Sequence, residues 1–233
     1  MINSKVFEVL SPLIEIIKAS IGKTIGEIKS ELNIERENMK KGASGLIVEN
    51  LLGKKNNNED EPDIPEIGCE IKVLPLQKNR DGLIKAKEPT QIQMINYFQV
   101  NSENWDNAKI RRKIKLTFWI VYLAKINSTS LLQDDYRIVD FFVDQPNDSI
   151  QEIFKKDWEA IKNYIKEGLA DRLSCSMGTY IEPKTKGKNN QDLTPAPNGH
   201  GGKIMVRRRA FYYKKNYTNT KVIPNLNLSI INE

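Results

Sequence analysis

The chain has 233 residues, of which 39% are hydrophobic, so it can bury a core as one domain or as one domain with two lobes. No apolar run reaches the roughly 18 residues of a membrane span, and the N-terminal segment lacks a basic leader with a small-residue cleavage site, so we expect a cytoplasmic protein with no membrane partner. Two distant cysteines and one histidine, His200 in a glycine-rich stretch, argue against a disulfide framework, a thiolate zinc site and histidine-centred catalysis.

The net charge of +6 is unevenly distributed along the chain. The segment GGKIMVRRRAFYYKKNY (201–217) contains basic residues and no acid, and PKTKGK (183–188) adds three lysines. Basic clusters interleaved with aromatic residues and glycines suit a nucleic-acid backbone, where cations displace counterions. The solvated surface of a lysine-rich protein fits the same charge pattern.

Apolar spacing predicts helices at the start of the chain. The first covers residues 6–20, and Thr24 with Glu27 forms a capping box that opens a second helix. A short third helix is expected over 44–52, followed by a polar loop at 53–63.

The middle of the chain favours β structure because it is rich in β-branched and aromatic residues. We expect its strands to form one sheet. A long helix then begins at 147–149, with Ser149 and Glu152 as its capping box and Gly168 near its end, and a loop follows Pro183. The expected strands are 67–76, 91–98, 113–124, 136–145 and 208–216.

The stretch PDIPEIGCEIK (62–72) places charges within an apolar strand. Because side chains alternate along a strand, Glu70 and Lys72 lie side by side on the face opposite the apolar one. Asp63 stands between two prolines, which favour an extended or turning segment that could fold back beside the strand. The residues expected on the core face are Ile67, Cys69, Ile71 and Val73.

This arrangement suggests metal-assisted chemistry. Two carboxylates at one end of a sheet can hold a hard divalent cation such as Mg²⁺. A neighbouring lysine can orient a water molecule and neutralise charge that develops on a phosphate. An ordinary ion pair on an exposed strand face fits the same short pattern.

Glu49 is a third acidic candidate. It is the one acid in SGLIVENLLG, and Gly45 and Gly53 flank it four residues away on either side, which would allow its helix to approach the sheet closely. An acid on so apolar a helix requires either solvent or a metal.

Three blocks, KGASGLIVENLLG (41–53), PDIPEIGCEIKVLPL (62–76) and RRAFYYKKNYT (208–218), resemble the MutH family of mismatch-repair nicking endonucleases and GATC-cutting type II restriction endonucleases. The spacing of Glu49, Asp63, Glu70 and Lys72 matches the catalytic signature of that family, and the resemblance covers about residues 20–220. It implies an α/β restriction-endonuclease-like PD-(D/E)xK core, a mixed β-sheet flanked by helices, with two lobes that form a DNA cleft. The whole chain, 1–233, would then be one endonuclease domain, with Glu49 in an N-terminal lobe and the DNA-recognition loop in a C-terminal lobe.

The resemblance also implies roles for individual residues. Asp63 and Glu70 would bind Mg²⁺, for which Mn²⁺ can substitute, and Glu49 would complete the carboxylate set. Lys72 would stand beside the attacking water. IRRKIKLTFW (110–119) resembles the family segment with a further active-site lysine, which falls on Lys113.

DNA-binding residues follow from the same resemblance and from the basic segments. TYIEPKTKGK (179–188) resembles the family's recognition loop, although Glu182 replaces an arginine of the family before the proline. Tyr212 matches a family tyrosine associated with sensing adenine methylation. The expected DNA-binding residues are Lys41, Pro183, Lys184, Lys186, Gly187, Arg207, Arg208, Tyr212, Lys214 and Lys215.

The sequence therefore predicts a Mg²⁺-dependent type II endonuclease that cuts double-stranded DNA at GATC and leaves 5′-phosphates. The chain would have to cut the two strands in turn or pair transiently on a palindrome, because we find one copy of the domain, whereas related restriction enzymes often carry a second, degenerate copy. One alternative is a strand-nicking mismatch-repair endonuclease, recruited by a MutL-like partner. Further alternatives are a non-catalytic DNA-binding module of the same fold and a basic nucleic-acid-binding protein without nuclease ancestry.

Overall fold

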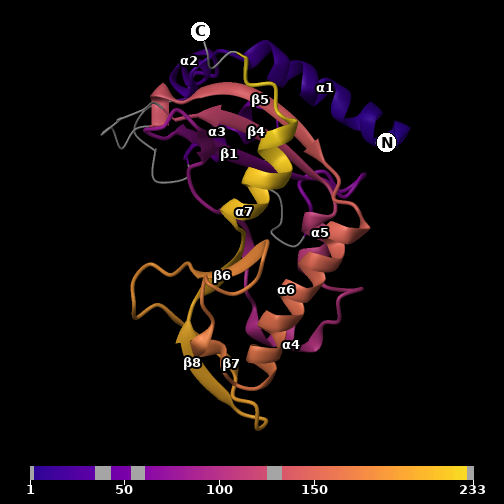
Figure 1. Ribbon diagram of the computed structural model, residues 1–233, viewed down its shortest axis with the longest axis vertical. Coiled ribbons are helices and arrows are strands. Elements are labelled where there is room, and N and C mark those ends of the chain that lie inside the picture. Colours follow the sequence, from indigo (N-terminus) through magenta and orange to yellow (C-terminus); the bar gives the residue numbers. More distant parts are fainter. Residues whose placement is uncertain (1–2, 35–42, 54–60, 125–132, 230–233) are drawn as a thin grey trace. The chain divides into compact units, whose positions relative to one another are not determined.

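The computed structural model describes residues 3–34, 43–53, 61–124 and 133–229. The chain divides into two compact units, and each is described by itself below (Figure 1). A single domain over 1–233 and a DNA cleft between two lobes remain predictions. The first unit comprises Met1–Glu88, Leu116–Gln145 and Asn219–Glu233, and the second comprises Pro89–Lys115 and Pro146–Thr218.

A mixed four-stranded sheet forms the centre of the first unit, with the strand order β2-β1-β4-β5. β1 (Glu70–Lys78) runs parallel to β4 (Thr117–Leu123), whereas β2 (Ile84–Ala86) and β5 (Arg137–Asp144) are antiparallel to their neighbours. β4 is apolar along nearly its whole length because it is covered on both faces. The predicted α/β class with a mixed sheet flanked by helices is confirmed.

Helices α1 (Ser4–Ser20), α2 (Ile25–Glu31) and α3 (Ala43–Leu51) pack on one face of this sheet. The predicted capping box begins α2, since the Thr24 hydroxyl accepts the Glu27 N–H and the Glu27 carboxylate accepts the Thr24 N–H. All three helices predicted for this part of the chain are confirmed.

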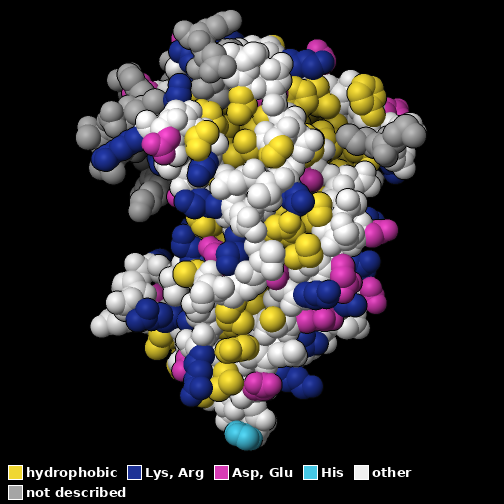
Figure 2. Space-filling view, in the orientation of Figure 1, with side chains coloured by type: hydrophobic (Ala, Val, Ile, Leu, Met, Phe, Trp, Pro, Cys, Tyr) yellow, Lys and Arg dark blue, Asp and Glu magenta, His cyan; other side chains and the backbone are white. Residues whose placement is uncertain are grey.

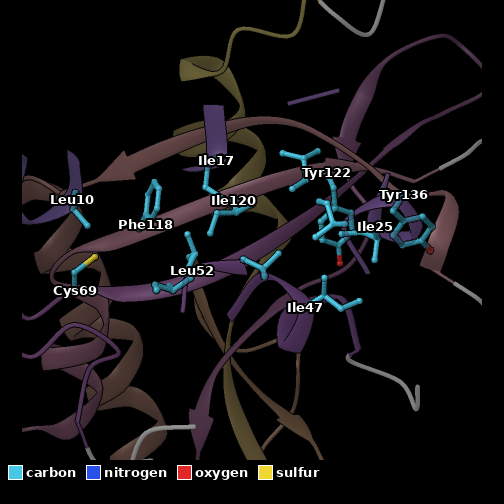
Figure 3. Packing of buried hydrophobic residues seen from close by; sticks show 14 of the residues in the cluster. Leu10, Ile17, Ile25, Ile47, Leu52, Cys69, Phe118, Ile120, Tyr122 and Tyr136 are labelled. Atoms are coloured by element: carbon cyan, nitrogen blue, oxygen red, sulfur yellow. The ribbon is translucent and has the colours of Figure 1, made fainter. Parts of the chain in front are cut away.

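The core of the first unit lies between these helices and the sheet. Figure 3 shows Leu10 of α1 beside Phe118 of β4, with Cys69 and Leu52 pointing into the same interior. These side chains are 5% exposed or less, so this face of the sheet is dry. The alternation predicted for 67–73 is confirmed, because Cys69 and Ile71 lie in the core and Ile67 and Val73 pack against it.

The second unit contains two antiparallel sheets, one with the order β3-β9-β6 and the other the hairpin β7-β8. An aromatic cluster around Phe154 packs the long helix α6 against the three-stranded sheet. The elements of this unit are β3 (Thr90–Met94), α4 (Tyr97–Ser102), α5 (Lys109–Ile114), α6 (Asp148–Lys166), β6 (Ile181–Thr185), β7 (Leu193–Pro197), β8 (Lys203–Arg207), β9 (Arg209–Tyr213) and α7 (Lys215–Tyr217).

Several sequence-based expectations were wrong at element boundaries. The strand expected over 91–98 ends at Met94, because the Asn96 side chain accepts the Gln99 N–H and begins α4. The strand expected over 113–124 begins at Thr117, and its first residues belong to α5 instead. The cap of α6 is Asn147, whose side chain accepts the Ile150 N–H, rather than a box formed by Ser149 and Glu152.

The expected strands also do not form one sheet. The strands of the two units hydrogen-bond separately, and the hairpin β7-β8 occupies a region that was expected to be loop. Among the described residues, no helix is both long and apolar enough to cross a membrane.

Candidate active site

A tight turn brings Asp63 to the beginning of β1. The backbone groups of Ile64 and Cys69 bond to each other in both directions, at 2.9 and 3.1 Å, and Gly68 provides the positive φ of 64° that the turn requires. The Asp63 carboxylate then accepts the N–H of Ile71 through Oδ2 at 2.8 Å. The prediction that this segment folds back beside the strand is confirmed.

Glu70 and Lys72 lie on the face of β1 opposite the helical core. The Lys72 ammonium donates to Oε1 of Glu70 at 2.7 Å, and the Glu70 side chain is only 3% exposed. A buried carboxylate is tolerated when it is paired and hydrogen-bonded, and the lysine holds the Glu70 side chain in one orientation.

Glu49 reaches the same region from α3. The predicted approach of this helix to the sheet is seen at Gly45. A Cβ atom added to this glycine would lie 4.0 Å from the side chain of Val73 in β1. The approach is not seen at Gly53, which has no neighbour within 4 Å and instead has a positive φ of 65° just beyond the helix end.

The electrostatics of Glu49 link it to the two motif carboxylates. Burial raises the pKa of Glu49, the charges of Asp63 and Glu70 raise it further, and Lys72 lowers it. Like charges have this effect only at short range, so the three carboxylates influence one another within the first unit.

The donor set suits a hard divalent cation. Within the described ranges, no three His, Cys, Asp or Glu side chains converge as metal ligands. Mg²⁺ in phosphoryl-transfer sites is commonly held by one or two carboxylates together with substrate phosphate oxygens, so a full protein cage is not required. A cation between Asp63 and Glu70 would also relieve the repulsion that raises the pKa of Glu49.

Sequence reasoning missed the residues beside Glu70 in the sheet. The strand register places Thr117 and Asp144 in one row with Glu70, so the three side chains share a face. Asp144 is buried, and its Oδ2 accepts the indole N–H of Trp119 at 3.1 Å. No sequence signal identified this row, because strand register is not visible in a single sequence.

The roles of two further lysines remain predictions. Lys113 is buried in α5, which belongs to the second unit, so its role beside the carboxylates remains a prediction. Lys41 lies outside the described residues.

The predicted recognition residues gather around β6 and β9 of the second unit. Pro183 and Lys184 lie in β6, and the Lys184 ammonium stands over the Tyr212 ring of β9 at 5.6 Å from its centre. Gly187 lies in the loop beyond β6, where a Cβ atom would be 3.1 Å from the Asp192 side chain. The same Asp192 pairs with Arg208 at 2.7 Å, so this loop is fastened to the start of β9.

The basic side chains of this unit differ in their exposure to solvent and in their hydrogen bonds. Lys186, Arg207, Arg208 and Lys215 are exposed, and Figure 2 shows Lys and Arg side chains on the surface around β6 and β8. The ammonium of Lys214 instead donates to the carbonyls of residues 177 and 178. His200 is exposed at the tip of the β7-β8 hairpin, where a loop was expected (Figure 2).

Sequence reasoning also missed Asp157 of α6. Its buried carboxylate accepts three consecutive backbone N–H groups, from Thr179, Tyr180 and Ile181, at 2.7 to 2.8 Å. Gly178 precedes them with a φ of 73°, and a Cβ atom there would lie 2.0 Å from the Ile181 carbonyl oxygen. Asp157 therefore sets the position at which β6 begins.

A mixed sheet with a turn aspartate beside a Glu-x-Lys strand is the arrangement expected of a PD-(D/E)xK nuclease core. Comparison with known proteins points to the same class. The family described as DNA mismatch repair enzyme MutH matches residues 52–157. The chain is thus similar to the MutH family, and the resemblance seen in its motifs is confirmed.

Individual relatives include enzymes of two kinds. The type II restriction enzyme Sau3AI of Staphylococcus aureus is 32% identical over 203 residues, which are 86% of this chain and 40% of that enzyme. The DNA mismatch repair protein MutH of Escherichia coli K12 is 28% identical over 200 residues, which are 84% of each chain, and MutH of Shigella flexneri is equally similar. The chain thus spans less than half of the restriction enzyme and most of the repair protein.

Proposed function

We propose that the chain is a Mg²⁺-dependent, sequence-specific DNA endonuclease of the type II restriction kind, which cuts double-stranded DNA at GATC and leaves 5′-phosphates. The observation that carries this proposal is the attachment of Asp63 to β1 between Glu70 and Lys72, which gathers two carboxylates and an ammonium at one strand end. The similarity to Sau3AI and MutH supports DNA as the substrate.

The residues of the site have distinct tasks in this proposal. Asp63 and Glu70, with Glu49 nearby, would hold Mg²⁺, which when bound polarises the scissile phosphate and stabilises the leaving 3′ oxygen. Lys72 orients the attacking water and neutralises the charge that develops on the phosphate. Its ion pair with Glu70 keeps the ammonium next to the carboxylate, so both groups are in place before DNA arrives.

Binding of DNA is assigned to the second unit. The exposed cations Lys186, Arg207, Arg208 and Lys215 suit phosphate contacts, and Lys184 suits the O6 and N7 atoms of guanine. An active site of this kind cuts one strand at a time, so cleavage of both strands requires two successive cuts, or two such sites that meet transiently on the palindrome.

Strand nicking in the manner of mismatch repair is the second candidate. It is favoured by the match of the family described as DNA mismatch repair enzyme MutH to residues 52–157 and by the 28% identity to MutH of Escherichia coli K12. Under this candidate a MutL-like partner would recruit the protein to DNA.

Cleavage of a sequenced plasmid separates the two candidates. Purified protein is incubated with supercoiled plasmid that is unmethylated or adenine-methylated at GATC, with Mg²⁺, with Mn²⁺ or with EDTA, and all ends are mapped to the nucleotide. Linear fragments with 5′-phosphates at GATC support the restriction enzyme, and nicked circles alone support the repair type. Bound but uncut DNA under every metal condition would overturn both.

A further inference from the structure

The three-stranded sheet of the second unit has one face that α6 does not cover. Ile181 of β6 is paired with Tyr213 of β9, and the Tyr213 ring contacts Phe154 of α6, so α6 lies on the face that these two residues share. Because side chains alternate, Glu182 and Tyr212, which are also paired, lie on the opposite face.

Glu182 is buried on that face without a hydrogen-bonding partner among the described residues. The residue is 6% exposed, but its carboxylate oxygens are not among the fully buried side-chain atoms that lack a hydrogen-bonding partner, so they reach solvent. Lys214 and Lys184 are close enough to lower its pKa, yet burial outweighs them and raises it. The carboxylate is therefore a charged acceptor that reaches solvent on this face, where it can accept a hydrogen bond from a ligand.

The backbone that carries Glu182 is held firmly from two sides. Asp157 accepts the N–H groups of residues 179 to 181, and Lys214 donates to the carbonyls of residues 177 and 178. A side chain on such a rigid element is suited to specific recognition, because it loses little conformational freedom when a ligand binds.

We propose that Glu182 is a specificity-determining residue whose carboxylate accepts a hydrogen bond from the exocyclic amino group of a target base, either cytosine N4 or adenine N6. The inference rests on the proposed function, since it concerns the bases that the same endonuclease reads. A carboxylate accepts from cytosine N4 in the major groove, and it repels the carbonyl oxygens that guanine and thymine present there. Lys184, on the same face of β6, is close enough to Glu182 to compensate part of its negative charge.

The test combines protein variants with altered bases. Glu182→Met removes the acceptor while keeping the length of the side chain, and Glu182→Gln retains one acceptor oxygen but adds a donor. Glu152→Gln is the matched control, because Glu152 is exposed on α6, which packs on the other face of the sheet. Thermal melting of each variant verifies that it is folded.

Duplexes carry the target site with cytosine replaced by 2-pyrimidinone, which lacks the N4 amino group, or with adenine replaced by purine, which lacks the N6 amino group. Equilibrium binding is measured by fluorescence anisotropy in Ca²⁺, and kcat/KM is measured in Mg²⁺. For wild-type protein and Glu152→Gln, we expect the binding affinity and kcat/KM to fall roughly 5- to 150-fold on one of the two modified duplexes. Glu182→Met should show no such loss, and the affected duplex identifies the base.

Other outcomes overturn the inference and can be told apart from failure of the proposed function. If wild type and Glu182→Met lose the same affinity on the modified duplexes and cleave the normal site, the role of Glu182 is refuted. The proposed endonuclease function then still stands. Selective binding with no cleavage by any variant would refute the endonuclease, while the binding data would still decide the role of Glu182. Binding without any base preference would refute the inference.

Discussion

The Asp63 carboxylate accepts the backbone N–H of Ile71 at 2.8 Å, which fixes the turn before β1 to the strand between Glu70 and Lys72. The same side chain therefore combines a structural hydrogen bond through Oδ2 with the negative charge that we propose binds the metal. These two contributions can be separated by substitution.

Asp63→Asn should abolish cleavage without destabilising the protein. The amide oxygen can still accept the Ile71 N–H, but the negative charge for the metal is lost, so the cleavage rate should fall about 100-fold or more. Asp63→Ala should lose cleavage and also about 1 kcal/mol of the free energy of unfolding. Rates on GATC duplexes and urea denaturation measure the two effects. Wild-type cleavage by Asp63→Asn would remove Asp63 from the metal site.

Glu49→Gln should make the metal-free protein more stable at about pH 8. Burial and the charges of Asp63 and Glu70 raise the pKa of Glu49, so the folded protein binds this proton more tightly than the unfolded chain does. The contribution of Glu49 to the free energy of unfolding therefore rises as the pH falls through the raised pKa. The gain in free energy of unfolding of Glu49→Gln over wild type should be full at alkaline pH and should vanish below the ordinary glutamate pKa.

Denaturation with urea at several pH values in EDTA measures this effect. Glu8→Gln serves as the control, because Glu8 is exposed on α1 and this substitution removes the same charge at the surface. A stability curve for Glu49→Gln that runs parallel to the wild-type curve at every pH would contradict the electrostatic account of the site.

Asp157→Asn should loosen the start of β6. The substitution places an NH₂ group against backbone N–H donors that the carboxylate now accepts, which should cost about 1 to 3 kcal/mol locally. Amide hydrogen exchange of residues 179 to 181 should accelerate, and discrimination between GATC and altered sites should weaken. Glu152→Gln, on the exposed side of the same helix, should leave exchange unchanged. Unchanged exchange in Asp157→Asn would show that the carboxylate does not hold this turn.

Asp144 and Trp119 should be energetically coupled through their hydrogen bond. Asp144→Ala leaves the buried indole N–H without this acceptor and should cost about 1 to 3 kcal/mol of stability. Trp119→Phe removes the N–H, so Asp144→Ala should cost less in that background. A double-mutant cycle by chemical denaturation measures the difference. Strictly additive effects would contradict a direct hydrogen bond.

The sequence predicted those parts of the fold that depend on local patterns. The helices α1 to α3 were found from apolar spacing and from the capping residues Thr24 and Glu27. The failures lie where a single side chain changes the backbone course. Asn96 begins a helix within a run of β-forming residues, and Asn147 caps α6 two residues before the expected serine. Side-chain caps of this kind outweigh the average propensity of a segment.

In the candidate site, too, the sequence predicted the residues that depend on local patterns and missed those that depend on distant segments. Alternation along one strand correctly placed Glu70 and Lys72 on one face, and the prolines around Asp63 indicated a turn. Asp144 and Asp157 were missed because their positions depend on strand register and on helix packing, which join segments far apart in the sequence. The face of β6 and β9 on which Glu182 lies was also missed, because it depends on the pairing of these two strands, which a single sequence does not show.

Single-turnover cleavage of a GATC duplex by Glu70→Gln and Lys72→Met is the most direct test of the central claim. Both variants should cut about 100-fold or more slowly than wild type while binding the duplex with nearly unchanged affinity, because they alter the catalytic strand end and not the basic surface. Lys78→Met, at the other end of β1, should cut normally. Substantial cleavage by a folded Glu70→Gln or Lys72→Met protein would contradict the assignment of this strand end as the catalytic centre.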